Sequence, residues 1–471
     1  MSISQDSAIT SDWRDKVPAA IDKLPNDVLL KIFAFYVDET RWMDDGWHLL
    51  VHVCRKWRNI VLGSPHQLDL QLVHTEKRPM RKTLEVWPPL PIVIGGDYYT
   101  KSGQDNLMAT LEHIDRVCEI KLWFISSSLW ERVLAATQVS FPILTHLDFW
   151  FSDEPASVIP DSFLGRSAPE LRKLSLKGAS FLGLSELLSS TRHLVELTLR
   201  KIPHSGYISP EAMVACLSTL TSLKELDLSF QSPQSRPDKE SRQPPLLART
   251  LLPTLTDFCF DGASDYLEDF VARIDAPLLN SMLIEFFHQV TFDTPQLAQF
   301  VSRIPHFKTR DEARILFSDD KVSITLPGPF DQGLDLEVRC EQLDLQLAFV
   351  TQVCSSSFPQ ALITTVERLY IWYWPEDQPD NIESSKWLEL LRPFTTAKGL
   401  YLSGGHVPCI ATTLQGLAED SEGVTEVLPA LQGLFVEGIQ LSESEQKAFE
   451  PFIAARQLSG HTMAISPWDG E

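Results

Sequence analysis

The fold is decided by the stretch APELRKLSLKGASFLGLSELLSSTRHLVELTL (168–199). It contains one short pattern twice, as LRKLSL and LVELTL, with apolar residues at the first, fourth and sixth positions. Apolar and polar residues alternate at the end of each copy, which is typical of a strand with one buried face. Between the copies, GLSELLSSTRH is typical of a short helical return. The stretch therefore predicts a strand, a helical connection and a second strand.

The same pattern recurs at intervals of 23 to 34 residues between its clear copies, a slightly stretched version of the leucine-rich-repeat period. One such unit cannot bury its own apolar face, so the copies must stack on one another. The sequence predicts an α/β solenoid, an irregular leucine-rich-repeat array with parallel strands inside and helices outside. The copies begin at Val117, Leu144, Leu171, Leu194, Leu223, Leu255, Cys340, Val366, Ala397 and Leu431, with weak copies near Leu279 and Arg310.

Composition limits the partners and the compartment. The chain has 471 residues and a net charge of −22, which argues against nucleic acid or an anionic membrane as the main partner, favours solubility and leaves room for a basic protein partner. Its seven cysteines form no CxxC motif, as expected of reduced thiols in the cytoplasm or nucleus. No apolar run approaches the roughly 18 residues of a membrane span. The opening residues MSISQDSAITSDWRDK lack the apolar core of a signal peptide.

A separate apolar unit precedes the repeats. KLPNDVLLKIFAFYVDE (23–39) places Pro25 where a helix can begin and repeats apolar residues at helical spacing. WHLLVHVCRKWRNIVLGSP (47–65) predicts a second amphipathic helical segment. Fewer than about 60 residues make a marginal core. Part of this apolar surface is therefore completed by the rest of the chain or by a partner.

These two segments resemble an F-box, and their SPHQLDLQL ending resembles the F-box proteins abundant in mushroom-forming fungi. The sequence departs from the family's pattern at Asn26-Asp27 and at HQLDL, where the motif often ends in Leu-Trp. The resemblance implies a docking module for the Skp-type adaptor of a cullin–RING ubiquitin ligase, with an apolar stripe entering the adaptor's helical groove. The implied adaptor contacts are Leu24, Pro25, Val28, Leu29, Ile32, Phe33, Leu49, Val53, Cys54 and Trp57; the motif also matches at Arg55, Arg58, Ser64 and Pro65.

The predicted organisation has four parts. Residues 1–20 form a disordered N-terminus, 21–72 an F-box-like helical domain, 73–450 the solenoid, and 451–471 a C-terminal cap and tail. Within the solenoid, residues 231–246 are rich in proline and charge and predict a flexible excursion. The repeat pattern is weak over 280–330, where we expect a distorted array.

The side chains between the leucines of each predicted strand point away from the core, to the concave face. Large aromatic side chains on such a face are favoured anchors for a partner. The preferred target-binding candidates are Trp123, Trp150, Tyr370, Trp372, Trp374 and Tyr401. The rest of the predicted face is His146, Asp148, Lys173, Lys177, Glu196, Arg200, Glu225, Asp227, Asp257, Asp261, Gln342, Asp344, Phe435 and Glu437. The alternative is that C-terminal loops fold over the rings.

The sequence contains no constellation that predicts catalysis. The pair His48 and His52 lacks a nearby third metal ligand, and neither a phosphate loop nor a GxSxG motif occurs. We therefore expect no enzyme activity, no metal and no cofactor. The favoured hypothesis is a substrate-receptor subunit, with the F-box-like domain on the adaptor and the repeats on a target protein. The alternative functions are a non-degradative scaffold that uses the adaptor contact and an enzyme on an α/β fold. The alternative architecture is several separate α/β domains.

Overall fold

The computed structural model forms two compact units, Met1–Glu119 (the N-terminal unit) and Ile120–Glu471 (the C-terminal unit). The structure describes residues 20–39, 46–74, 80–96, 98–151, 157–233, 249–287, 292–329, 332–373, 383–403, 407–418, 423–438 and 443–469. The predicted disordered N-terminus and most of the predicted excursion at 231–246 lie outside these residues, as does Trp374.

The N-terminal unit begins with three helices and continues into two parallel strands. Its elements are α1 (Asn26–Glu39), α2 (His48–Val53), α3 (Arg55–Gly63), β1 (Leu72–His74), α4 (Met80–Val86), β2 (Ile92–Gly96) and α5 (Lys101–Leu111). Strand β1 pairs with β2, so that Leu72 lies opposite Ile92. The unit extends to Glu119 and so includes β1, α4, β2 and α5 as well as the three helices.

The three helices have a core of their own. Leu29 and Phe33 on α1 are fully buried, and the Phe33 ring lies 4.7 Å from that of Trp57 on α3. Helix α3 begins where the Cys54 sulfur accepts a hydrogen bond from the Trp57 N–H at 3.5 Å. The Trp47 indole donates to the Gln71 carbonyl at 2.8 Å, which ties the start of α2 to the segment before β1.

The C-terminal unit is built on one mostly parallel sheet. Strand β3 (Val117–Trp123) crosses the division between the units. The following strands lie in the order β4 (His146–Trp150), β6 (Lys173–Lys177), β8 (Glu196–Ile202), β9 (Glu225–Phe230), β11 (Asp257–Gly262), β13 (Ser281–Phe286), β16 (Gly333–Arg339), β15 (Lys321–Pro327), β14 (Glu312–Phe317), β17 (Arg368–Tyr373), β18 (Gly399–Leu402), β19 (Gly433–Glu437) and β20 (Ala464–Trp468). Each repeat thus adds one strand beside the last.

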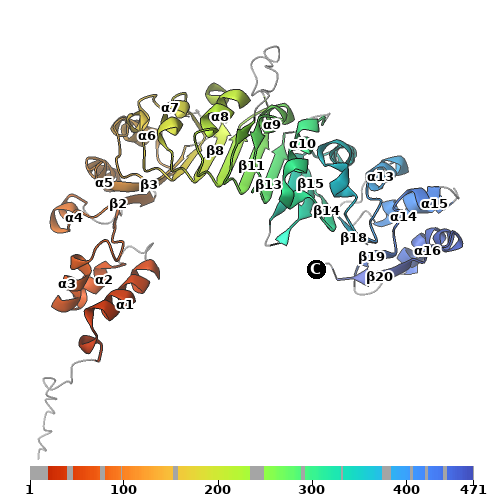
Figure 1. Cartoon of the computed structure of the whole chain (residues 1–471), viewed down its shortest axis with the longest axis horizontal. Coiled ribbons are helices and arrows are strands. Elements are labelled where there is room, and N and C mark those ends of the chain that lie inside the picture. Colours follow the sequence, from red (N-terminus) through yellow and green to blue (C-terminus); the bar gives the residue numbers. More distant parts are fainter. Residues whose placement is uncertain are drawn as a thin grey trace, which may run out of the picture. The chain divides into compact units, whose positions relative to one another are not determined.

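Helices cover one side of this sheet and leave the strands lining the other (Figure 1). The leucines of the repeats explain the asymmetry: Leu174, Leu197 and Leu226 lie opposite one another on adjacent strands and are all buried. Stacking of these rows closes a continuous core. The helices are α6 (Ser127–Ala136), α7 (Leu184–Ser190), α8 (Pro210–Leu217), α9 (Ser264–Val271), α10 (Pro295–Arg303), α11 (Leu343–Gln352), α12 (Gln360–Ile363), α13 (Ser384–Leu391), α14 (Val407–Ala418), α15 (Gly423–Glu426) and α16 (Glu443–Leu458).

Two short parallel pairs accompany the main sheet. Strand β5 (Ser157–Val158) pairs with β7 (Ala179–Ser180), and β10 (Thr250–Leu251) pairs with β12 (Ile274–Asp275). The arrangement of the C-terminal unit, one strand per repeat with helical returns on one side, is that of a leucine-rich-repeat-like solenoid.

The regular succession breaks between β13 and β17. Strand β15 runs antiparallel to both β14 and β16. After β13 the chain leaves two strand positions empty and forms β14, and β15 and β16 then fill the two positions between β14 and β13. Strand β14 falls in the weak stretch 280–330. The expected repeat strand at CEQLDL (340–345) is wrong: α11 begins at Leu343, and the preceding GLDLEVR (333–339) supplies strand β16 instead.

The C-terminal end adds a further repeat. Helix α16 leads into β20, which pairs in parallel with β19, so that Phe435 lies opposite Ser466. The segment predicted as cap and tail, 451–471, therefore supplies the last strand of the sheet. Its sequence HTMAISPW lacks the leucine pattern and gave no signal of a strand.

Candidate protein-binding surfaces

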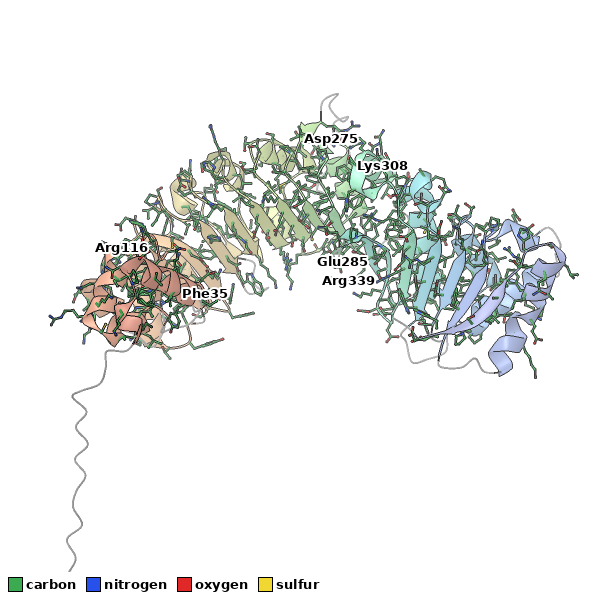
Figure 2. The ribbon with its side chains drawn as sticks, turned by 60° about the horizontal axis from the view of Figure 1, so that its bottom comes forward. Phe35, Arg116, Asp275, Glu285, Lys308 and Arg339 are labelled. Atoms are coloured by element: carbon green, nitrogen blue, oxygen red, sulfur yellow. The ribbon has the colours of Figure 1, made fainter. Side chains whose placement is uncertain are left out.

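The helices of the N-terminal unit leave apolar side chains in solvent. Ile32 and Phe35 on α1 are 43% and 71% exposed, and Leu49 and Val53 on α2 are 52% and 58% exposed. Monomeric proteins rarely leave apolar side chains exposed in groups without a binding role. We refer to these four residues as the helix patch; Figure 2 labels Phe35.

The structure divides the ten predicted adaptor contacts into two sets. Leu29 and Phe33 are buried in the helical core and are not available to a partner. Exposed members are Pro25, Ile32, Leu49 and Val53, whereas Leu24, Val28, Cys54 and Trp57 are half-buried. Phe35 was missed by sequence reasoning, although it stands three residues after Ile32, at helical spacing.

The bare face of the C-terminal sheet carries polar side chains in register. From β4 to β13 one row reads His146, Lys173, Glu196, Glu225, Asp257 and Ser281. Adjacent strands lie about 4.8 Å apart, so each side chain of a row is within reach of the next. The predicted parity of these strands is therefore the observed one, with leucines inward and polar residues outward.

Carboxylates dominate the middle of this face. The outward positions of β9, β11, β13 and β16 hold seven acidic side chains and one basic side chain, Arg339. We call the seven the acidic band: Glu225, Asp227, Asp257, Asp261, Glu285, Asp335 and Glu337. The exposed side chain of Leu283 lies on β13 among them.

Three cations partly neutralise the acidic band. Arg200 on β8 lies 2.6 Å from Asp227, and Lys321 on β15 lies 3.0 Å from Glu337. Arg339 pairs with Glu285, and Figure 2 shows both labels on the bare side of the sheet. These ion pairs join adjacent strands across the face.

Burial and like charge act together on Asp261. Its partly buried position, then the nearby charge of Glu285, raise its pKa to about 6, although a hydrogen bond from Ser229 at 3.0 Å and the charge of Arg339 oppose the rise. Burial, followed by the charges of Glu196 and Asp257, also raises the pKa of Glu225. The acidic band is thus crowded enough to disfavour its own charged state.

Aromatic rings dominate the C-terminal end of the same face. Tyr370 stacks on Tyr401 at 4.2 Å between ring centroids, and Tyr401 stacks on Phe435 at 4.3 Å. Trp372 lies 5.3 Å from Tyr370 on the same strand. Trp468, from the last strand, lies 5.5 Å from both Tyr370 and Tyr401. These five residues form the ring cluster.

Two glycines make room for the stacked rings. A Cβ at Gly399 would lie 2.8 Å from the Tyr401 ring, and one at Gly433 would lie 2.7 Å from the Phe435 ring. The rings of Tyr401 and Phe435 therefore each lie over the glycine two residues earlier in their own strand. This close approach lets three rings from adjacent strands stand face to face.

The ring cluster covers part of its own surface. Tyr370, a predicted target contact, is only 9% exposed, while Trp372 and Tyr401 are half-buried. Trp468 contributes to this cover, since its ring lies against three members of the cluster. The alternative prediction, that C-terminal loops fold over the rings, is therefore partly correct. Trp468 lies against the rings, but it belongs to strand β20 and not to a loop.

A second aromatic group lies at the first strands of the sheet. The structure brings the predicted pair Trp123 and Trp150 together, with ring centroids 5.9 Å apart. The Trp123 indole donates to Asp148 at 3.1 Å, and the Lys177 ammonium lies 4.3 Å above the Trp150 ring. Phe124 beside them is 69% exposed with a positive φ of 52°, a conformation rare for a bulky residue.

Two predicted face residues lie elsewhere. Gln342 precedes α11 and Asp344 lies in its first turn, where Asp344 pairs with Lys386 at 2.9 Å. The leucines of CEQLDL follow the helical period here instead of the strand period. These residues therefore belong to the helical side of the array.

The histidine pair of α2 packs against aromatic rings. His48 is buried, with its ring 4.0 Å from that of Trp47 and 5.1 Å from that of Trp87, whereas His52 is exposed. Within the described ranges, no three His, Cys, Asp or Glu side chains converge as metal ligands would. No helix of the described chain is long and apolar enough to cross a membrane.

Comparison with known proteins adds little to this geometry. No protein-family model and no curated protein matches the chain. Among solved structures, the chain is similar to the leucine-rich repeat-containing protein LegL7 from Legionella pneumophila. The two share 16% sequence identity with a TM-score of 0.30, over 70% of this chain and 95% of that chain. A likeness of this size carries no argument about fold or function.

Proposed function

We propose that this protein is a substrate-receptor subunit of a cullin–RING ubiquitin ligase. Its N-terminal helices dock a Skp-type adaptor, and through it a cullin, while its repeat array holds the target protein. The other subunits supply the chemistry, so the chain itself is no enzyme and needs no cofactor. Such a subunit works in the cytoplasm or nucleus.

The observation that carries the adaptor contact is the helix patch. Helix α1 buries Leu29 and Phe33 in its own unit yet leaves Ile32 and Phe35 exposed. Burying one aliphatic or aromatic side chain of this size contributes about 1.5 to 3 kcal/mol, so the four exposed residues represent a large unused driving force for association. The resemblance of residues 24–65 to an F-box supports the adaptor as the partner that uses it.

The sheet of the C-terminal unit supports the second contact. The strands line the side of the sheet that the helices leave bare (Figure 1), and their outward side chains form rows, as repeat proteins use for extended binding surfaces. Aromatic groups stand at both ends of the face, around Trp150 and around Tyr401. Aromatic side chains are frequent binding anchors in protein interfaces.

Co-purification of the full chain with a Skp-type adaptor tests the adaptor contact. The variant Ile32→Ser, Leu49→Ser, Val53→Ser removes three exposed members of the helix patch without touching the buried core. The matched control places serine at three exposed leucines of the C-terminal unit, Leu182, Leu251 and Leu278. We expect adaptor binding by the native chain and the control, and its loss in the helix-patch variant.

The result that contradicts the proposal is a folded native chain that does not bind the adaptor. Equal binding by the helix-patch variant would likewise move the contact away from these residues. Once a target is identified, ubiquitin transfer to it in a reconstituted ligase separates a substrate receptor from a scaffold that only associates with the adaptor.

A further inference from the structure

The acidic band holds more negative charge than its neighbours neutralise. Ion pairs with Arg200, Lys321 and Arg339 engage three of its seven carboxylates. The remaining four are Glu225, Asp257, Asp261 and Asp335. Asp257, Asp261 and Asp335 accept hydrogen bonds from the hydroxyls of Thr256, Ser229 and Thr325, and the charges of Lys173 and Arg314 act on Glu225 and Asp335. A hydroxyl donor does not cancel a carboxylate's charge.

Asp261 is the most poorly satisfied member of the band. One of its oxygens, Oδ1, is buried with no hydrogen-bond partner among the described residues. The other accepts from Ser229, and Glu285 on the adjacent strand adds a like charge. A carboxylate in this position is poorly compensated, so a cationic side chain docked over the band supplies the opposite charge that it lacks.

The shape of the band favours a segment of chain over a metal ion. Its carboxylates are spread along adjacent strands, and no group of three converges as metal ligands would in the described part of the chain. Four adjacent strands span three gaps of about 4.8 Å, a distance that about five extended residues cover. Leu283 lies exposed within the band, where it offers apolar surface to the aliphatic stems of arginine or lysine.

We propose that the acidic band docks a short, extended, arginine- and lysine-rich segment of a partner protein. This inference rests on the proposed function, because the segment is then the part of the target that the array recognises. Charge complementarity selects the partner: cationic side chains offset the like charges that Glu285 and Asp227 place on Asp261, and that Asp257 places on Glu225. The rings at either end of the sheet remain available to flanking residues of the same partner.

Peptide binding to the full chain tests the proposal. The probe is a fluorescent peptide of alternating arginine and serine, beside peptides of equal length in which glutamine or glutamate replaces arginine. Fluorescence anisotropy is measured at low and at physiological salt. We expect the arginine peptide to bind most tightly, with an affinity that falls as salt rises.

A matched pair of variants separates the band from the chain's overall charge. The first, Glu225→Gln, Asp257→Asn, Asp261→Asn, neutralises three members of the band that its three ion pairs do not engage. The second, Glu131→Gln, Glu389→Gln, Glu450→Gln, removes the same charge from exposed helical positions of the same unit. We expect the first to weaken arginine-peptide binding at least about tenfold and the second to leave it nearly unchanged. Thermal unfolding of each variant confirms that it is folded.

Three results overturn the proposal: equal losses in the two variants, no loss in the first, or equal binding of the glutamine peptide by the native chain. Adaptor binding, measured on the same preparations, keeps this failure distinct from failure of the proposed function. If the adaptor binds and the arginine peptide does not, the basic partner is wrong and the adaptor contact stands. If the peptide binds and the adaptor does not, the reverse holds.

Discussion

Two apolar surfaces of this protein are built in opposite ways. In the helix patch, Ile32 and Phe35 extend from a helix whose other apolar face is already buried. In the ring cluster, Tyr370, Tyr401 and Phe435 stack on one another, and Trp468 lies against two of them. The helix patch remains exposed to solvent, whereas the ring cluster buries much of its own surface within the chain. Exposed aliphatic positions on a helix are therefore better evidence for a partner here than a count of aromatic residues.

Backbone geometry explains the difference. Adjacent parallel strands lie about 4.8 Å apart, close to the stacking distance of aromatic rings, so rings at equivalent positions satisfy one another. Residues on the exposed face of α1 have no adjacent strand whose side chains could cover them. Ile32 and Phe33 are adjacent in sequence, and one lies in solvent while the other lies in the core.

The largest expected effect separates the two faces of α1. Phe33→Ala removes a fully buried ring that contacts Trp57 and should destabilise the N-terminal unit by about 3 to 5 kcal/mol. Ile32→Ala, at an exposed position, should cost less than about 1 kcal/mol. Thermal and denaturant unfolding measure both changes. Similar losses would show that Ile32 is part of the core and not of a docking surface.

A smaller loss is expected beneath the ring cluster. Arg456 on α16 is fully buried and donates from Nη2 to the carbonyls of Pro429 and Leu431, both at 3.1 Å, just before β19. Arg456→Met leaves these carbonyls without that donor and should destabilise the C-terminal unit by about 2 to 3 kcal/mol. The control is Arg192→Met, at an exposed position. An unchanged unfolding midpoint for Arg456→Met would show that these two hydrogen bonds do not stabilise the C-terminal unit.

A pair of glycine substitutions tests the stacking itself. Gly433→Ala places a Cβ against the Phe435 ring and should cost about 1 to 2 kcal/mol, with a change in near-ultraviolet circular dichroism as the rings shift. Gly416→Ala, within α14 where a Cβ meets no atom within 4 Å, should instead stabilise by about 0.5 to 1 kcal/mol. Equal effects of the two changes would mean that the rings do not need the glycine.

The smallest effect concerns the acidic band and depends on pH. The pKa of Asp261 is raised from about 3.8 to about 6, so the folded state binds more protons between these values and its stability falls as pH rises through this window. Asp261→Asn removes this cost. It should be more stable than the native chain by about 1 kcal/mol above pH 6, with no difference below about pH 4. A stability difference between Asp261→Asn and the native chain that grows towards low pH would contradict the predicted direction of the pH dependence.

The sequence predicts those features of the fold that repeat. Copies of the leucine pattern locate β4, β6, β8, β9, β11, β17, β18 and β19, because buried leucines at period two leave a direct trace in the sequence. The same parity places Asp227 and Asp261 on the bare face. Neither the acidic band nor its orphaned oxygen could be inferred, since both depend on the register between strands.

The leucine pattern gives a wrong or missing strand prediction in two places, CEQLDL (340–345) and β20. CEQLDL has the spacing of a repeat strand, yet its leucines also suit the first turn of a helix, and the strand forms just before it. Strand β20 has no leucine pattern because it lies at the sheet edge, with one strand neighbour and much of its length accessible. Trp468 was therefore missed, although the alternative of C-terminal loops over the rings anticipated cover from this end of the chain.

Measuring two binding affinities in the same set of variants tests whether the chain has two separate docking surfaces. Adaptor affinity and arginine-peptide affinity are measured for the native chain, for the helix-patch variant with serine at Ile32, Leu49 and Val53, and for the acidic-band variant neutralised at Glu225, Asp257 and Asp261. We expect the helix-patch variant to lose only adaptor binding and the acidic-band variant to lose only peptide binding. Loss of both ligands in either folded variant, or of neither, would contradict two separate docking surfaces on one chain.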